Sequence, residues 1–115
     1  MGLSVALVNF ELGKPSIPQA QTRLTAEIRA ARARGTTVLK IIHGYGSSGA
    51  GGDLRIALQA MLRQMCERRE IRDCVYGEDW RKSNERAWKL VKQFPELKSD
   101  SDFGKGNPGI TIVVL

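Results

Sequence analysis

The apolar residues of the chain repeat at two different spacings, and these spacings predict where strands and helices lie. Four short, mostly apolar segments have the length of strands and are rich in valine, isoleucine and leucine: residues 3–10, 36–43, 71–76 and 109–115. Between them, apolar residues recur every three or four positions, as on one face of a helix, in residues 16–35, 53–65 and 83–94. The predicted order is therefore β-α-β-α-β-α-β.

The first helix carries the clearest boundary signals. Ser16, followed three residues later by Gln19, has the form of a capping box, in which each side chain accepts a hydrogen bond from the other residue's backbone N–H. Gly35 is the residue at which we expect the helix to end. The apolar residues with helical spacing should form its buried face: Ala20, Leu24, Ile28 and Ala31.

The alternation of strands and helices predicts a single α/β domain over residues 1–115. Its helices should cover a sheet through right-handed crossover units. The last strand, residues 109–115, is apolar at almost every position, which favours a central place in the sheet. A chain of 115 residues has one modest core and cannot hold a nucleotide-binding domain joined to a catalytic domain.

Positive charge is concentrated in one part of the chain. Lys and Arg number 18 against 12 Asp and Glu, which gives a net charge of +6. Residues 14–40 hold six of the basic residues and a single acidic one, Glu27, so they account for +5 of that total. Such an excess favours polyanionic partners such as nucleic acid. For the arginines at 23, 29, 32 and 34, a solvated helix face is the first explanation, and a contribution to nucleic-acid binding is the second.

The sequence has the features expected of a soluble cytoplasmic protein. No apolar stretch approaches the roughly 18 residues that cross a bilayer, so we expect no membrane association. Cys66 and Cys74 are too few for a disulfide scaffold, and with one histidine in the chain they do not have the spacing of a zinc site. No metal site is predicted, and any need for a divalent metal or another cofactor stays open.

A glycine-rich segment, residues 44–52, follows the second predicted strand and precedes the second helix. Such a turn presents backbone N–H groups and the positive end of the helix dipole, which together bind anions. We expect Asp53 to cap the helix. Residues 44–49 also fit G-x-G-x-x-G, but a dinucleotide site needs a larger domain, and the lysine of a Walker loop is absent.

Three side chains near this segment are candidates for function. His43 lies where the second strand ends, a usual place for catalytic groups in α/β sheets, although a structural role is the alternative. Glu11 follows the first strand and could orient His43 and raise its pKa, or could be a surface charge. Arg55 could bind a phosphate or pair with Asp53. Trp80, Trp88 and Phe94 are expected to pack in the core and its edge.

Three segments give the chain a resemblance to the Smr (small MutS-related) domain family. Residues 41–46, with the sequence I-I-H-G-Y-G, are similar to the family's strand and His-Gly-x-Gly signature. Residues 53–58 resemble the start of its next helix, and residues 109–115 resemble its last strand. The longer segment 77–107 makes the chain similar to the stand-alone bacterial members. The role of this segment stays open, and covering a sheet face is one possible role.

The resemblance implies a two-layer α/β sandwich like the C-terminal domain of bacterial initiation factor three. It also implies nucleic-acid binding, with DNA-nicking or RNA-cleaving endonuclease activity in several members. The family's Leu-Asp-x-His motif falls on residues 8–11, where Asn9 replaces the acid and Glu11 replaces the histidine. Asn9 cannot act as a base, so these two departures bear on catalysis more than on binding.

The first functional hypothesis is a DNA- or RNA-binding domain that acts as an endonuclease, with His43 and Glu11 as the catalytic residues. The residues expected to hold the phosphate backbone are Gly44, Gly46, Ser47, Gly49, Gly51, Gly52 and Arg55. The alternative is a non-catalytic RNA- or ribosome-associated module that has lost the first motif. A mononucleotide or phosphate-ester site in the glycine-rich segment is a third reading.

Overall fold

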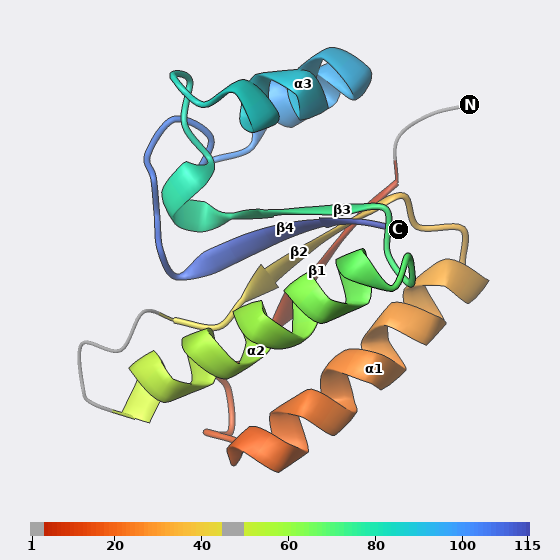
Figure 1. The fold of residues 1–115 in the computed structure, drawn as a ribbon, viewed down its shortest axis with the longest axis vertical. Helices are drawn as coiled ribbons and strands as arrows, with labels where there is room; N and C mark the ends of the chain where they lie inside the picture. Colours follow the sequence, from red (N-terminus) through yellow and green to blue (C-terminus); the bar gives the residue numbers. More distant parts are fainter. Residues whose placement is uncertain (1–3, 45–49) are drawn as a thin grey trace.

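A computed structural model describes residues 4–44 and 50–115 (Figure 1). Within these residues the strands β1 (Val5–Asn9), β2 (Val38–Ile42), β3 (Asp73–Tyr76) and β4 (Ile110–Val114) form one sheet in the order β1-β2-β4-β3. Strands β1 and β2 are parallel, whereas β4 runs antiparallel to both of its neighbours. The predicted α/β class and the central place of the last strand are confirmed.

The strand β4 departs from the crossover pattern expected for every unit. The chain enters β4 at the end of the sheet where β2 finishes. There the carbonyl of Gly109 accepts hydrogen bonds from the backbone N–H groups of His43 and Gly44. It therefore runs antiparallel between β2 and β3. The β1–α1–β2 unit keeps the expected parallel arrangement.

The helices are α1 (Ile17–Ala33), α2 (Ala50–Glu67) and α3 (Glu85–Gln93). The capping box of α1 is present, with both hydrogen bonds between Ser16 and Gln19, and its predicted apolar face is the face that is buried. The prediction that Asp53 caps α2 is wrong. This helix begins at Ala50, so Asp53 lies in its first turn, where its carboxylate still interacts favourably with the helix dipole.

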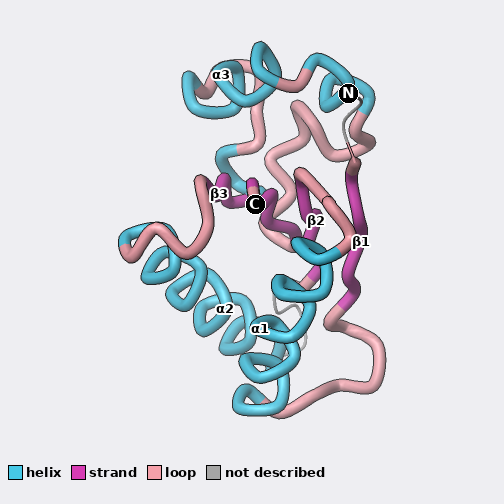
Figure 2. The backbone as a smooth tube through the Cα atoms, turned by 90° about the vertical axis from the view of Figure 1, so that its right-hand side faces the viewer, coloured by secondary structure: helices cyan, strands magenta, loops and turns pink. Residues whose placement is uncertain are grey.

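Helices α1 and α2 pack side by side on one face of the sheet, and segment 77–107 covers part of the other (Figures 1 and 2). This segment contains α3 and two 3₁₀ helices, η1 (Gly77–Asp79) and η2 (Pro95–Ser99). Fully buried Trp80 packs against Phe103 with the rings tilted and their centroids 4.9 Å apart, and Trp88 meets Phe103 edge-on. The segment adds a partial third layer to the sandwich of sheet and helices. No helix among the described residues has the length and apolarity needed to span a bilayer.

Lys40 anchors this added layer to the centre of the sheet. Its ammonium lies 2.9 Å from Asp100 and 2.6 Å from Asp102, and all three side chains are largely buried. The second carboxylate oxygen of Asp100 accepts a hydrogen bond from the indole of Trp80 at 3.0 Å. A lysine in an otherwise apolar strand is therefore neutralised by residues about 60 positions later in the chain.

Replacing Lys40 with methionine should destabilise the protein, because the aliphatic stem is kept while two buried carboxylates lose their cation. We expect the free energy of unfolding at pH 7, from urea denaturation, to fall by about 3 kcal/mol. The exposed Lys92 on α3 supplies the control, Lys92→Met, with a change within about 0.5 kcal/mol. Equal stability of the two variants would contradict the anchoring role.

The same contacts should make stability depend on acidity. The hydrogen bond from Lys40 lowers the pKa of Asp102 below its usual 3.8. The stabilisation is therefore complete above that value and is lost as the pH falls through the lowered pKa. This acid-dependent part should shrink in Lys40→Met.

Candidate functional site

The carboxyl ends of β1 and β2 lie at the same edge of the sheet, near the start of α2 (Figure 1). Glu11 follows β1, His43 follows β2, and Arg55 lies in the second turn of α2. Ligands of open α/β sheets bind at this edge, because loops and helix N-termini converge there. The fold therefore brings three of the predicted site residues to one end of the molecule.

His43 is buried, with 1% of its surface exposed, and both of its ring nitrogens have partners. Nδ1 lies 2.8 Å from the carbonyl oxygen of Gly44, which can only accept, so Nδ1 carries the proton. Nε2 lies 2.9 Å from the hydroxyl of Thr111 on β4. In the neutral ring Nε2 is an acceptor, so the Thr111 hydroxyl donates to it. His43 thus joins the ends of β2 and β4.

The surroundings of His43 favour its neutral form. Burial is the main cause that lowers its pKa below 6.5, and the positive charge of Arg55 acts in the same direction. The carbonyl of Gly44 and the carboxylates of Glu78 and Glu11 act against this and do not reverse it. The rise in the pKa of His43 that Glu11 could cause does not occur, because desolvation outweighs the nearby carboxylates.

The side chain of Glu11 lies next to Gly44, at the start of the glycine-rich segment. A Cβ atom placed on Gly44 would lie 3.3 Å from the carboxylate carbon of Glu11, and the φ of Gly44 is +77°, a conformation that favours glycine. The side chain of Asn9 accepts a hydrogen bond from the backbone N–H of Glu11 at 2.8 Å, which fixes the turn after β1. The ring nitrogens of His43 are held by Thr111 and Gly44, so Glu11 does not orient the imidazole as expected.

Arg55 pairs with an acidic residue that the sequence did not indicate. Its guanidinium Nη1 lies 3.0 Å from Glu78, which follows β3, so the pairing with Asp53, one of the two alternatives, is replaced by a pairing with Glu78. The other carboxylate oxygen of Glu78 accepts from the buried side chain of Gln59 at 3.1 Å. The Nε atom of Arg55 is buried and has no hydrogen-bond partner among the described residues. A buried donor without an acceptor calls for an explanation, such as a bound water, ion or ligand.

The glycine-rich segment is described only in part. Gly44 ends the first described part, and Gly51 and Gly52 lie in the first turn of α2. Gly46, Ser47 and Gly49 fall outside the described residues. The first turn of a helix leaves backbone N–H groups without acceptors inside the helix, so the start of α2 can bind an anion.

Within residues 4–44 and 50–115, no group of three or more His, Cys, Asp or Glu side chains is placed to hold a metal ion. Cys66 and Cys74 are free thiols. Burial raises the pKa of the Cys74 thiol to about 11, so this thiol is protonated and unreactive at neutral pH.

Comparisons with known proteins identify the family. The Smr domain model matches residues 12–115. The chain belongs to the Smr domain family. Its structure is similar to that of the Smr domain of Thermus thermophilus MutS2, with a TM-score of 0.56 and 18% sequence identity over 98% of each chain. A comparison with curated proteins finds no significant match.

The family assignment confirms the resemblance inferred from the sequence. The segments that carried it, residues 41–46, 53–58 and 109–115, all lie within the matched range. Residues 8–11, where Asn9 and Glu11 depart from the first motif, precede that range. Members of this family bind nucleic acids, which is consistent with DNA or RNA as partners of this chain.

His43 is the single histidine of the chain, so its state can be measured without ambiguity. Long-range ¹H–¹⁵N NMR spectra at pH 7 should show a neutral ring protonated at Nδ1, with a titration midpoint below 6.5. Because the unfolded chain then binds the proton more readily, stability should decline as the pH falls below 6.5. An Nε2-protonated ring, or a midpoint at or above the usual value, would contradict the hydrogen bonds assigned here.

Proposed function

We propose that this Smr domain binds a phosphate of the DNA or RNA backbone at the start of α2, between Gly44 and Arg55. The observation that carries the proposal is the buried Nε of Arg55, which has no acceptor within the described residues. A phosphate oxygen would supply that acceptor, and guanidinium groups bind phosphates through paired N–H donors. The net charge of +6 supports a polyanionic partner.

The position of Arg55 supports the same proposal on electrostatic grounds. A cation near the N-terminus of a helix is disfavoured by the helix dipole. The carboxylate of Glu78 offsets part of this cost and holds one edge of the guanidinium. A phosphate beside the first turn would offset the rest, since it interacts favourably with both the dipole and Arg55.

We assign His43 a positioning role in this binding site. By holding the carbonyl of Gly44 and the hydroxyl of Thr111, it fixes where β2 ends and where the glycine-rich segment begins. We include the expected phosphate-binding residues of that segment in the proposal: Gly44, Gly46, Ser47, Gly49, Gly51 and Gly52. The free thiols of Cys66 and Cys74 support a reducing, cytoplasmic setting.

Loss of the Arg55 guanidinium should weaken binding. We expect Arg55→Ala to raise the Kd for fluorescently labelled single-stranded DNA and RNA about tenfold at low salt, and to reduce the slope of log K against log salt by about 0.7. Arg86 on α3 also pairs with one acid, Asp73, so Arg86→Ala is a control with the same change in charge. Equal Kd values and slopes for the two variants would remove Arg55 from the site.

Phosphodiester cleavage is the second candidate function, and the position of Glu11 favours it. Its side chain is exposed and lies against Gly44, next to the proposed phosphate site, where a carboxylate could act as a general base. His43 would contribute to catalysis only after releasing Thr111, since its Nε2 is occupied. Without cleavage, the domain would be an RNA- or ribosome-associated binding module.

Cleavage can be tested with supercoiled plasmid and a long single-stranded RNA, with and without a divalent metal. If the domain is a nuclease, Glu11→Gln should abolish turnover while keeping the Kd, because glutamine has the same shape and cannot accept the proton. Glu67→Gln at the far end of α2 is the matched control, and His43→Ala tests the histidine. Substrates left intact by a wild type and a His43→Ala variant that both still bind them in a salt-sensitive way would favour the binding module instead.

A further inference from the structure

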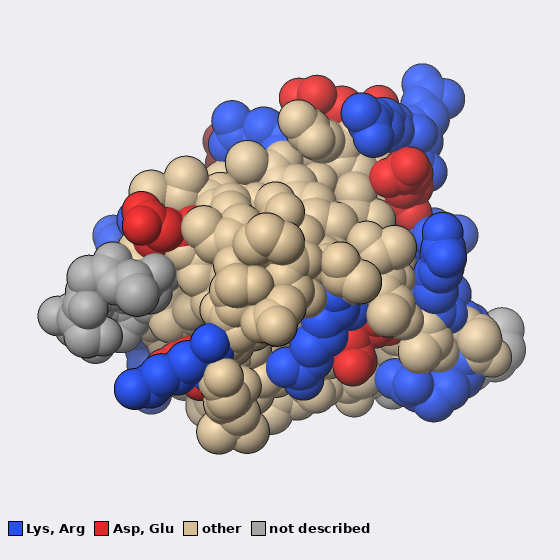
Figure 3. Space-filling model, turned by 90° about the horizontal axis from the view of Figure 1, so that it is seen from below, with Lys and Arg blue, Asp and Glu red and all other residues tan. Residues whose placement is uncertain are grey.

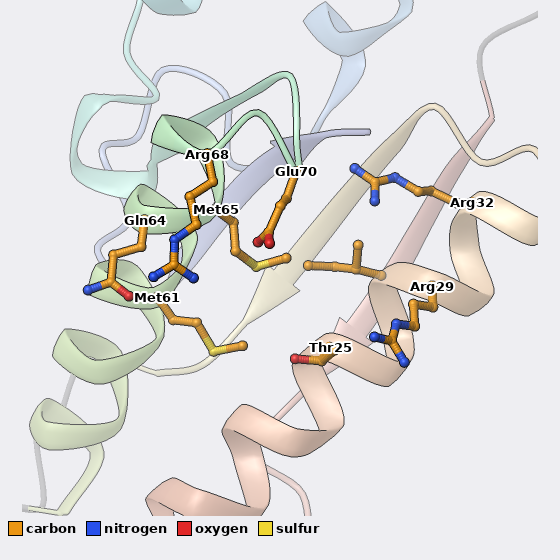
Figure 4. A pocket seen from close by; sticks show the side chains of 9 residues that line it. Thr25, Arg29, Arg32, Met61, Gln64, Met65, Arg68 and Glu70 are labelled. Carbon is orange, nitrogen blue, oxygen red and sulfur yellow. The ribbon is translucent and has the colours of Figure 1, made fainter.

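A groove of about 390 Å³ lies between α1 and α2, at the opposite end of α2 from the proposed phosphate site (Figure 4). Its apolar part is formed by Ile28 of α1 and by Met61 and Met65 of α2. Polar side chains from both helices and from the residues that follow α2 line the rest: Thr25, Arg29, Arg32, Gln64, Arg68 and Glu70. The groove therefore combines an apolar floor with a charged rim.

The rim carries more positive charge than the surrounding structure neutralises. Arg29 and Arg32 come from α1, and Arg68 follows the end of α2. All three are exposed, and none forms an ion pair within residues 4–44 and 50–115. Glu70 is the single acidic side chain lining the groove, which leaves a net charge of +2 there. Basic groups dominate this end of the α1–α2 face (Figure 3).

The helix dipole explains only part of this arrangement. Arg32 lies in the last turn of α1, where a cation is favoured. Arg29 lies just before that turn, where the effect is weaker, and Arg68, which follows α2, lies on the other side of the groove (Figure 4). Cations that line one groove repel each other, and Glu70, the single acid of the lining, offsets one of the three positive charges.

We propose that this groove is a second contact for the phosphate backbone of a nucleic-acid strand. The inference rests on the proposed function and extends it from one phosphate to a path along α2. Arginine forks match phosphate oxygens, and the polarizable methionine side chains on the floor can pack against a sugar or base. Arg55 and Arg68 are separated by about 20 Å along the helix axis, which corresponds to about six phosphates of a duplex strand.

Replacing Glu70 tests the proposal through an expected gain, rather than a loss, of affinity for nucleic acid. Its side chain points into the groove between Arg68 and Arg32 (Figure 4), where its negative charge would repel a phosphate. Glu70→Gln should therefore tighten binding about threefold at low salt. Damage to the fold would weaken binding instead, so a gain in affinity separates the electrostatic effect from a structural one.

The main experiment compares two charge-matched double variants. Arg29→Ala with Arg32→Ala removes the α1 side of the groove. Lys89→Ala with Lys92→Ala removes two lysines that have the same spacing on α3. Lys92, like Arg32, lies in the last turn of its helix, so the two double variants are matched in position as well as in charge. Fluorescence anisotropy would give the Kd of each variant for single-stranded DNA and RNA of about 2 and about 20 nucleotides over a range of salt concentrations.

The groove variant should bind the long strands about tenfold more weakly than the wild type and with a salt slope smaller by about 1.4. It should bind the short strands as the wild type does, since these cannot reach from Arg55 to the groove. The lysine control should match the wild type at both lengths.

Three other results would overturn the inference. Equal binding by the groove and control variants would exclude the groove and leave the phosphate site at Arg55 in place. Loss of binding to a polyglutamate peptide, with nucleic-acid binding unchanged, would assign the groove to an acidic protein segment. Failure of the wild type to bind either strand length would overturn the proposed function itself.

Discussion

The burial of β4 on both faces is the constraint on which the rest of the structure depends. All five residues of this strand are buried, so each face of the sheet needs a covering layer. Helices α1 and α2 supply one layer, and segment 77–107 supplies the other. The ion pairs of Lys40 with Asp100 and Asp102 tie that second layer to the neighbouring strand. The extra length of this segment thus has a structural purpose, because it keeps water away from the strand that organises the sheet.

The same strand determines the geometry of the candidate site. Gly109, just before β4, accepts hydrogen bonds from the backbone of both His43 and Gly44, and Thr111 holds the imidazole. His43 is therefore as much a part of the fold as of the site. A neutral, fully bonded ring is well suited to fixing the end of β2, and it is poorly suited to exchanging protons with a substrate. This is why binding is the first proposed function and cleavage the second.

Local signals in the sequence predicted most of the fold but few of the contacts in the site. The capping box at Ser16 and the apolar β4 depend on neighbouring residues, and both were predicted correctly. The partner of Arg55 is Glu78, 23 residues away, and it could not be predicted because the contact exists only after β3 joins the sheet. Thr111 did leave a signal, since a polar residue in a buried strand must find a hydrogen-bond partner. The sequence alone could not identify that partner as His43.

The two ends of α2 differ in how their positive charge is balanced. At the start of the helix, Glu78 pairs with Nη1 of Arg55 and offsets part of its charge, so an incoming phosphate is attracted mainly at short range, by the Nε donor and the helix N-terminus. At the other end, Arg29, Arg32 and Arg68 have no such partner in the described structure, and their field extends into solvent. The proposed groove would then attract a strand at long range, while the site beside Gly44 would select its geometry at short range. Because an exposed charge is screened more strongly than a half-buried pair, salt would weaken the groove first.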